Sequence, residues 1–102
     1  MNPEHDERRR YQRVAFEAKG RFLAPDGSEH PCSIRDMSLG GIAITSAYPV
    51  EVGAQVIVYL DEFGRFEGPV VRSFDDGFAI ETAISGPRRE RLRQRLEALE
   101  DA

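Results

Sequence analysis

The chain has 102 residues, of which 40% are hydrophobic and 31% charged, and its formal net charge is -4 at pH 7. This length suffices for one small domain with a single core and excludes two. No stretch approaches the ~20 consecutive apolar residues of a membrane span, and the charged N-terminus predicts no signal peptide. The single cysteine, Cys32, allows no internal disulfide and fits a reducing cytoplasm. Two histidines far apart argue against a structural zinc site.

The charges are unevenly distributed along the chain. Residues 1–21 contain six Lys or Arg against four acids, residues 22–84 contain three against ten, and residues 85–102 contain five against four. Binding of long DNA or RNA needs a broad basic surface, and the acidic middle of this chain would repel a nucleic-acid backbone. A short basic cluster suffices for a small anionic ligand, so the sequence favours such a ligand over long nucleic acid.

The predicted elements begin after residues 1–8, which have no apolar periodicity and predict a flexible arm. Six stretches with alternating or continuous apolar residues predict β-strands, and they cover residues 14–24, 32–37, 42–47, 54–62, 66–74 and 78–84. Turn-rich residues separate these stretches, and residues 75–77 (DDG) are a strong hairpin signal. Pro69 within the fifth stretch favours an edge strand or a bulge.

The last segment, residues 85–102, changes to a helical period. Leu92, Leu96 and Leu99 fall at helical spacing, and Pro87 suits the first turn of a helix. We expect one amphipathic helix over about residues 87–99, whose leucines cover an open side or end of the strands. Six short strands followed by one helix predict a mostly-β fold, a six-stranded antiparallel barrel with a C-terminal helix.

The first candidate site is the arginine cluster before the first strand, which contains Arg8, Arg9, Arg10 and Arg13. The spacing R-x-x-x-R that joins Arg9 to Arg13 recurs twice within residues 89–95. There it lies in the predicted helix, where residues four apart share one exposed face. The N-terminal cluster stands instead at the junction of an arm and a strand. By itself it also fits an ordinary basic arm on the surface.

The second candidate site is the sequence DMSLGG, residues 36–41. In a plain turn, Asp36 and Ser38 would hydrogen-bond to the nearby backbone and a glycine would take a positive φ. In a recognition loop, the Asp36 carboxylate accepts hydrogen bonds from paired N–H donors, and the Ser38 hydroxyl donates or accepts. Gly41 would let a flat ligand lie against the backbone. The segment alone does not decide between these two interpretations.

The two candidate segments become informative together. Twenty-two residues separate Arg13 from Asp36, about the length of one hairpin, so the second segment can return beside the first. Arginine binds phosphate with two parallel hydrogen bonds, stacks on purine rings and matches the O6/N7 edge of guanine. Aspartate matches the remaining guanine donors, N1–H and N2–H. The two segments could therefore jointly bind phosphate and guanine.

On these residues the sequence resembles the PilZ domain family, which pairs an R-x-x-x-R motif with a D-x-S-x-x-G motif. The resemblance covers residues 8 to about 84 and implies a barrel domain, over residues 9–84, that binds the bacterial second messenger cyclic di-GMP. It implies that Arg9 and Arg13 hold phosphate and the Hoogsteen edge of guanine. It also implies three guanine contacts on the barrel surface, from Asp36, Ser38 and Gly41. The sequence departs from the family pattern in the stretch GFAIET, residues 77–82: the resemblance leads us to expect an aromatic residue near Thr82, and none stands beside it.

Arg8 directly precedes the first motif. In the PilZ family, as the resemblance implies, an arginine at this position goes with two stacked cyclic di-GMP molecules per domain, and a bulky apolar residue goes with one. Two stacked ligands bring four negative charges together, and a third guanidinium offsets their repulsion. We therefore expect two ligands per chain, although Arg10 could replace Arg8 if the arm slips by one residue.

We predict a cytoplasmic sensor or adaptor that binds cyclic di-GMP, orders its arginine arm and presents a changed surface to an unidentified partner protein. No Ser-His-Asp constellation or phosphate-cradling glycine loop is present in the sequence, so we expect no enzymatic activity, and we expect no cofactor or metal. The alternative is a structural or protein-interaction module that binds no nucleotide. The sequence leaves open whether Arg72 points toward the ligand or to solvent.

Overall fold

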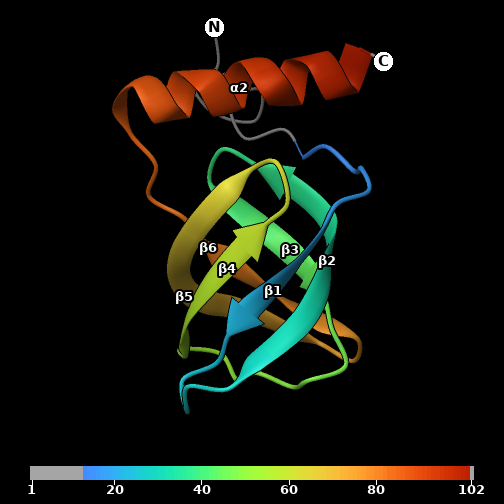
Figure 1. Cartoon of the computed structure of the whole chain (residues 1–102), viewed down its shortest axis with the longest axis vertical. Helices are drawn as coiled ribbons and strands as arrows, with labels where there is room; N and C mark the ends of the chain where they lie inside the picture. The colour runs from blue at the N-terminus through green and yellow to red at the C-terminus, as the bar shows by residue number, and fades with distance from the viewer. Residues whose placement is uncertain (1–12, 102) are drawn as a thin grey trace, which may run out of the picture.

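The computed structural model describes residues 13–101, which form six β-strands and one helix (Figure 1). The elements in chain order are β1 (Lys19–Leu23), β2 (Glu29–Ser38), β3 (Gly41–Thr45), β4 (Gln55–Leu60), β5 (Gly64–Phe74), β6 (Gly77–Glu81) and α2 (Gly86–Asp101). The arm predicted over residues 1–8 lies outside the described residues, as do Arg8 and Arg9. No helix within residues 13–101 is both long and apolar enough to cross a membrane.

The strands form a closed antiparallel barrel in the order β1-β2-β3-β6-β5-β4. Four neighbouring pairs are consecutive in the chain, and two others, β3 with β6 and β1 with β4, join strands distant in sequence. The ring closes through β1 and β4, where Gly20 lies opposite Leu60 and Leu23 opposite Ile57. The predicted fold class, a six-stranded antiparallel barrel with a C-terminal helix, is therefore confirmed.

Alternation along the strands fills the barrel with apolar side chains. In β4, Val56, Val58 and Leu60 are buried, as their spacing predicts, and Tyr59 between them faces outward. The rings of Phe22 and Phe78 meet edge-to-face in the interior, with 4.9 Å between their centroids. This continuous core fixes the outward-facing residues of each strand on a rigid surface.

The first strand is shorter than the predicted residues 14–24. Val14 forms an isolated bridge with Met37, and regular pairing with β2 resumes only at Lys19, opposite Ser33. Five residue steps on the first segment thus face four on β2, so a regular ladder cannot run through residues 15–18. Alternation alone does not reveal this extra residue. Because of it, Arg13 stands on a short segment attached to the end of β2.

Two β-bulges place polar residues on the outside of the barrel. In β2, the register shifts between Ile34 and Asp36, and in β5 it shifts between Val70 and Arg72. Ile34 and Val70 are buried, so strict alternation would have pointed Asp36 and Arg72 into the core as well. Each bulge adds one residue to its strand, so that the polar residue after it, Asp36 or Arg72, faces the surface.

The barrel is closed, so Pro69 does not occupy the edge strand that the sequence allowed. It pairs with Gln55 in the register of β4 and β5, and the bulge between Val70 and Arg72 follows directly. The predicted hairpin at residues 75–77 is present, because β5 ends at Phe74 and β6 begins at Gly77.

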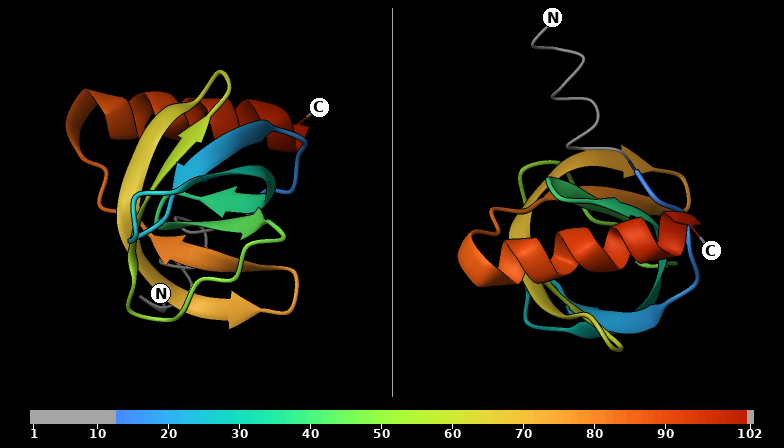
Figure 2. Two further views of the ribbon diagram at one scale, coloured as in Figure 1. Left: turned by 60° about the horizontal axis from the view of Figure 1, so that its bottom comes forward. Right: turned by 90° about the horizontal axis from the view of Figure 1, so that it is seen from above.

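Helix α2 lies across one end of the barrel, as the views in Figures 1 and 2 show. Leu92 and Leu96 are buried in the barrel core, which confirms that the helix covers an open end. Leu99 is 36% exposed, so the expectation that all three leucines pack on the barrel is wrong for this residue. Helical spacing places the three leucines on one stripe, but it does not tell where along the stripe the barrel ends.

Two arginines of α2 bind the helix to the β4–β5 hairpin. The guanidinium of Arg88 stacks over Phe66 at 4.7 Å from the ring centroid and donates to the backbone carbonyl of Arg65. Arg95 stacks over Phe63 at 4.1 Å and donates to the carbonyl of Glu62. These stacked, hydrogen-bonded cations add to the leucine contacts and fix the helix over the barrel end.

Candidate functional site

Arg13 is held at the end of β2 by its neighbour in the chain. The bridge between Val14 and Met37 has two backbone hydrogen bonds, with N···O distances of 2.8 and 3.0 Å. From this position the Arg13 guanidinium forms an ion pair with the Asp36 carboxylate, and its Nη1 lies 3.5 Å from the Ser38 hydroxyl. The fold thus brings together Arg13, Asp36 and Ser38, three residues that the sequence assigned to one site.

Asp36 begins a row of residues that runs straight across four strands. Its Cα partner on β3 is Ala43, the partner of Ala43 on β6 is Ala79, and the partner of Ala79 on β5 is Arg72. The outside of the barrel here consists of a carboxylate, two methyl groups and a guanidinium, in that order. Both charged ends of the row are the residues that the bulges turned outward. Between the acceptor and the cation the row has two alanines, of which Ala43 is buried and Ala79 half-buried, and both line the hollow above it.

The concavity over this row, which we call the β3–β6 depression, has a volume of about 320 Å³. Its lining includes the four residues of the row together with Arg13, Arg35 and Gly41. The Arg35 guanidinium lies over the Phe74 ring and 3.8 Å from the Asp76 carboxylate. The size is at the lower end of ligand pockets, and the mixture of small apolar and convergent polar groups is typical of them.

Ser38 and Gly41 stand at the turn that joins β2 and β3. The Ser38 hydroxyl accepts a hydrogen bond from the backbone N–H of Gly40, at 3.3 Å. A methyl group added at Gly41 would lie 2.8 Å from the Ile80 carbonyl oxygen, which is closer than real side-chain carbons come. The turn is present with the expected Ser38 contact to the backbone, but neither Gly40 nor Gly41 has the positive φ of the plain-turn interpretation. Gly41 is needed for close strand packing whether or not a ligand touches it.

Arg72 is the residue whose direction the sequence left open. It is exposed and shares the β3–β6 depression with Asp36, and no ion pair joins it to another side chain within residues 13–101. The only sequence signal for a bulge in this strand was Pro69, and it does not tell which residue the bulge turns outward. Arg8 and Arg9 lie outside the described residues, so the structure does not place them.

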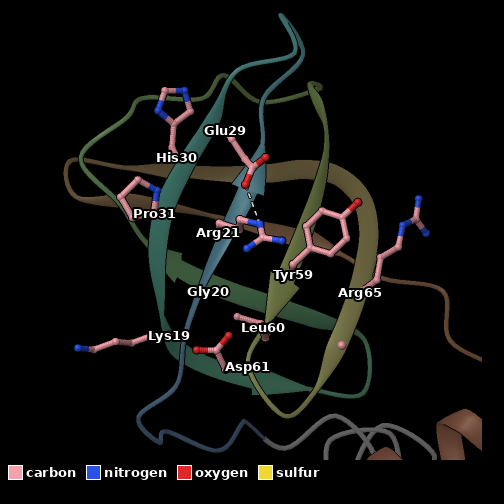
Figure 3. Close-up of a pocket in the computed structure, with 11 residues that line it drawn as sticks. Lys19, Gly20, Arg21, Glu29, His30, Pro31, Tyr59, Leu60, Asp61 and Arg65 are labelled. Carbon is pink, nitrogen blue, oxygen red and sulfur yellow. Dashed lines mark ion pairs between the residues drawn. The ribbon is translucent and has the colours of Figure 1, made fainter.

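A larger hollow, the β1–β4 depression, lies on another side of the barrel and has a volume of about 650 Å³ (Figure 3). Its two arginines are paired with carboxylates, whereas Lys19 and Asp61, which also line it, form no ion pair among residues 13–101. Arg21 pairs with Glu29 at 2.7 Å and stacks over Tyr59, and Arg65 pairs with Glu67 at 3.0 Å. Hydrogen bonds that Arg65 donates to Glu67, and then to Tyr59, raise the pKa of Arg65 above its ordinary value. Arg21 and Glu29 lie on neighbouring strands, and Arg65 and Glu67 lie two residues apart on β5; exposed pairs of both kinds are typical of a solvated barrel surface.

Within residues 13–101 no group of three His, Cys, Asp or Glu side chains is arranged to hold a metal ion. The thiol of Cys32 is buried in the barrel, and burial raises its pKa to about 11, with a smaller contribution from the charge of Asp61. A thiol with so high a pKa is a poor nucleophile at neutral pH. The β3–β6 depression therefore remains the best candidate for a binding site.

Comparison with known proteins identifies the family. The family model of the PilZ domain matches residues 7–98. A crystal structure of the PilZ domain of CeSA from a cellulose-synthesizing bacterium matches with a TM-score of 0.63 and 17% sequence identity, covering 87% of this chain and 98% of that chain. At this identity the structural likeness shows a shared fold. No curated protein matches the sequence. Because the family match spans nearly the whole chain and includes both motifs, the chain belongs to the PilZ domain family.

Proposed function

We propose that this protein is a cytoplasmic cyclic di-GMP sensor that binds its ligand over the β3–β6 depression. The PilZ family is known for cyclic di-GMP binding. The observation that carries the proposal for this chain is the row from Asp36 through Ala43 and Ala79 to Arg72, with Arg13 beside it. A guanine ring lies flat on the two methyl groups, Asp36 accepts from N1–H and N2–H, and Arg72 stacks on or donates to the base edge.

Ligand binding exchanges one ion pair for others. Without ligand, Arg13 is paired with Asp36, and their side chains are 45% and 26% exposed. An exposed pair of this kind contributes only about 0.2–1 kcal/mol. A hydrogen bond to a charged group contributes about 1.5–3 kcal/mol. A phosphate that takes Arg13 therefore releases the Asp36 carboxylate for guanine at a net gain, and phosphate and guanine recognition become linked.

The arginines that precede the described residues complete the proposal. Arg9 joins Arg13 on the phosphate and the Hoogsteen edge of guanine, and Arg8 offsets the charge of a second, stacked ligand. Ordering the arm costs roughly 1–2 kcal/mol per residue. The charge-assisted hydrogen bonds must exceed this sum for the arm to close. The closed arm then presents a new surface to a downstream protein, and the domain acts as an adaptor with no catalytic step.

Isothermal titration calorimetry with cyclic di-GMP, at two salt concentrations and with cyclic di-AMP as the control ligand, tests this proposal. We expect preferential binding of cyclic di-GMP, an affinity that falls with salt, and an equivalence point of two ligands per chain. Absence of binding would leave the alternative, a protein-interaction module. An equivalence point of one ligand would retain the sensor but remove the role of Arg8, and Arg8→Leu would then leave the ratio unchanged instead of lowering it from two to one.

A further inference from the structure

A second concavity adjoins the candidate site on the side of α2, and we call it the helix-side depression. It has a volume of about 580 Å³ and lies between the turn after β2, the segment after β6 and the start of the helix. Its polar lining consists of Arg13, Ser38, Glu81, Thr82 and Arg89. Arg13, Gly40 and Glu81 line both this concavity and the β3–β6 depression, so the two hollows adjoin around these residues.

Two arginines of α2, Arg89 and Arg91, have no ion pair or side-chain hydrogen bond among residues 13–101, and of these two only Arg89 is half-buried. Arg88 and Arg95 bind the β4–β5 hairpin, and Arg93 pairs with Glu90 and Glu97. A guanidinium is strongly favoured to have an acceptor when it is partly removed from water.

The floor of the same depression holds a second unsatisfied group. Thr82 is 9% exposed, and its hydroxyl Oγ1 is buried without a hydrogen-bond partner among residues 13–101. The backbone N–H of Thr82 is bound to the Gly40 carbonyl at 3.0 Å, which fixes the residue against the turn after β2. Most buried hydroxyls are hydrogen-bonded in native structures, so an isolated one in the same concavity as a half-buried guanidinium points to a missing acceptor.

We infer that the helix-side depression is a subsite for an anionic phosphate oxygen, with Arg13 and Arg89 as its cations and the Thr82 hydroxyl as a neutral donor. The lining has two guanidiniums and one carboxylate, Glu81, and Arg13 is also paired with Asp36 until the ligand takes it. Phosphate oxygens accept from several donors at once, which suits this set. The inference rests on the proposed function: a cyclic dinucleotide over the β3–β6 depression extends one phosphate past Arg13 into the helix-side depression. Arg89 then makes α2 part of the binding site.

Calorimetric titration of the full chain with cyclic di-GMP tests the subsite with matched variants. Arg89→Ala is expected to weaken binding by about tenfold or more, because it removes a charged hydrogen bond. Arg91→Ala serves as the control, since Arg91 is exposed on the same helix and lines a different hollow at the β4–β5 hairpin. Equal affinities of the parent, Arg89→Ala and Arg91→Ala would overturn the subsite while leaving the proposed function intact.

Thr82→Val separates a ligand role from a structural one. The substitution keeps the shape and removes a buried hydroxyl that has no partner, so the melting temperature is expected to equal or exceed that of the parent. Cyclic di-GMP binding is nonetheless expected to weaken severalfold. A Thr82→Val protein that melts lower and binds normally would contradict a donor role for this hydroxyl.

A second probe keeps the inference testable if the parent does not bind cyclic di-GMP. Inorganic pyrophosphate is titrated into isotope-labelled protein, and the NMR signals of the Arg89 side chain Nε–H and the Thr82 amide are followed. Saturable shifts of both signals in the parent, lost in Arg89→Ala and retained in Arg91→Ala, would support an anion subsite that serves another nucleotide. Signals that do not move would overturn it.

Discussion

The two sides of the barrel differ in how their charged residues are arranged, and the motif residues Arg13, Asp36 and Gly41 line the smaller of the two hollows. The β1–β4 depression is about twice as large as the β3–β6 depression, at about 650 against 320 Å³, and both contain arginines and carboxylates. On the larger side, Arg21 and Glu29 belong to adjacent strands of one hairpin and satisfy each other. On the smaller side, Arg13 and Asp36 are joined across an isolated bridge, and Arg72 stands across an apolar stretch of two alanines.

The difference originates in the backbone. No register shift separates β1 from β2 or from β4, so ordinary alternation decides which residues face outward around the β1–β4 depression. Around the β3–β6 depression two bulges override alternation and expose Asp36 and Arg72. Bulges are frequent beside functional sites because they redirect a side chain without unfolding the strand. The larger hollow also has an exposed cation without an ion pair among the described residues, Lys19, so what distinguishes the β3–β6 side is the pair of outward-turned charges with an apolar stretch between them.

The largest expected effect is a loss of folding stability when the packing of helix α2 on the barrel is disturbed. Helix α2 contributes to the helix-side depression but to none of the lining of the β1–β4 depression. Leu96→Ala should lower the free energy of unfolding by about 2–5 kcal/mol, because Leu96 is buried in the core. Leu99→Ala, at a half-exposed position of the same helix, should have little effect. Urea denaturation measures both, and equal stabilities of the two variants would show that α2 is not packed on the barrel.

The next largest expected effect is the slow reaction of the Cys32 thiol, which lies in the barrel wall near the β1–β4 depression. Cys32 lies in β2 opposite Gly20, which lines the β1–β4 depression, and its thiol pKa is raised to about 11 by burial and then by Asp61. At pH 8 the native thiol should react with a disulfide reagent roughly a hundredfold more slowly than the same thiol in urea, where its pKa returns to ~8.5. Free cysteine in the same buffers is the control.

The sign of the pH dependence follows from the same shift. A thiol whose pKa is higher in the folded than in the unfolded protein holds its proton better when folded, so stability should decrease as pH rises above ~8.5. Fast labelling of the native protein would show that the barrel wall under the β1–β4 depression opens easily. The larger hollow would then have to be considered as a site that forms on opening.

Arg13→Ala should weaken cyclic di-GMP binding at least about tenfold, because a charged hydrogen bond to phosphate is worth about 1.5–3 kcal/mol. Arg21→Ala is the matched control, since Arg21 is also an exposed arginine paired with a carboxylate, but on the β1–β4 side. We expect its affinity to equal that of the parent in calorimetry. If Arg21→Ala loses affinity and Arg13→Ala does not, the ligand binds the larger hollow and the comparison above is reversed.

Sequence patterns were sufficient for much of the fold because the barrel core obeys simple periodicity. Alternation correctly predicted the buried side of β4, and helical spacing correctly predicted the burial of Leu92 and Leu96. The extent of β1 depends on the extra residue opposite β2, and the exposure of Leu99 depends on where the barrel ends along the helix. The periodicity of the sequence carries neither kind of information. Arg72 illustrates the same limit at the site, since only the register shift after Val70 turns it outward.

The sequence was sufficient to assign the motif residues to one site. It was not sufficient to predict which contacts they make without a ligand. Chemistry suggested that Arg13 and Asp36 serve one ligand, and the structure joins them in an ion pair. Gly41 was interpreted as a place where a flat ligand meets the backbone, and its closeness to the Ile80 carbonyl gives it a packing role that exists without any ligand. Gly41→Ala is consequently a poor test of binding, because the barrel itself would have to shift.

Asp36→Ala is expected to have the smallest effect on affinity and the most specific one. Removal of the carboxylate loses the acceptor for guanine N1–H and N2–H, but it also frees Arg13 and removes a negative charge near the phosphate. These two changes partly offset each other, so the affinity for cyclic di-GMP should fall less than in Arg13→Ala. The preference for cyclic di-GMP over cyclic di-AMP should fall more, because adenine has no N1–H or N2–H to offer Asp36.

Asp61→Ala, which removes a carboxylate from the β1–β4 depression, should keep the preference of the parent. Competition calorimetry with the two dinucleotides measures the ratio, and an unchanged ratio in Asp36→Ala would mean that guanine is recognised elsewhere on the β3–β6 side.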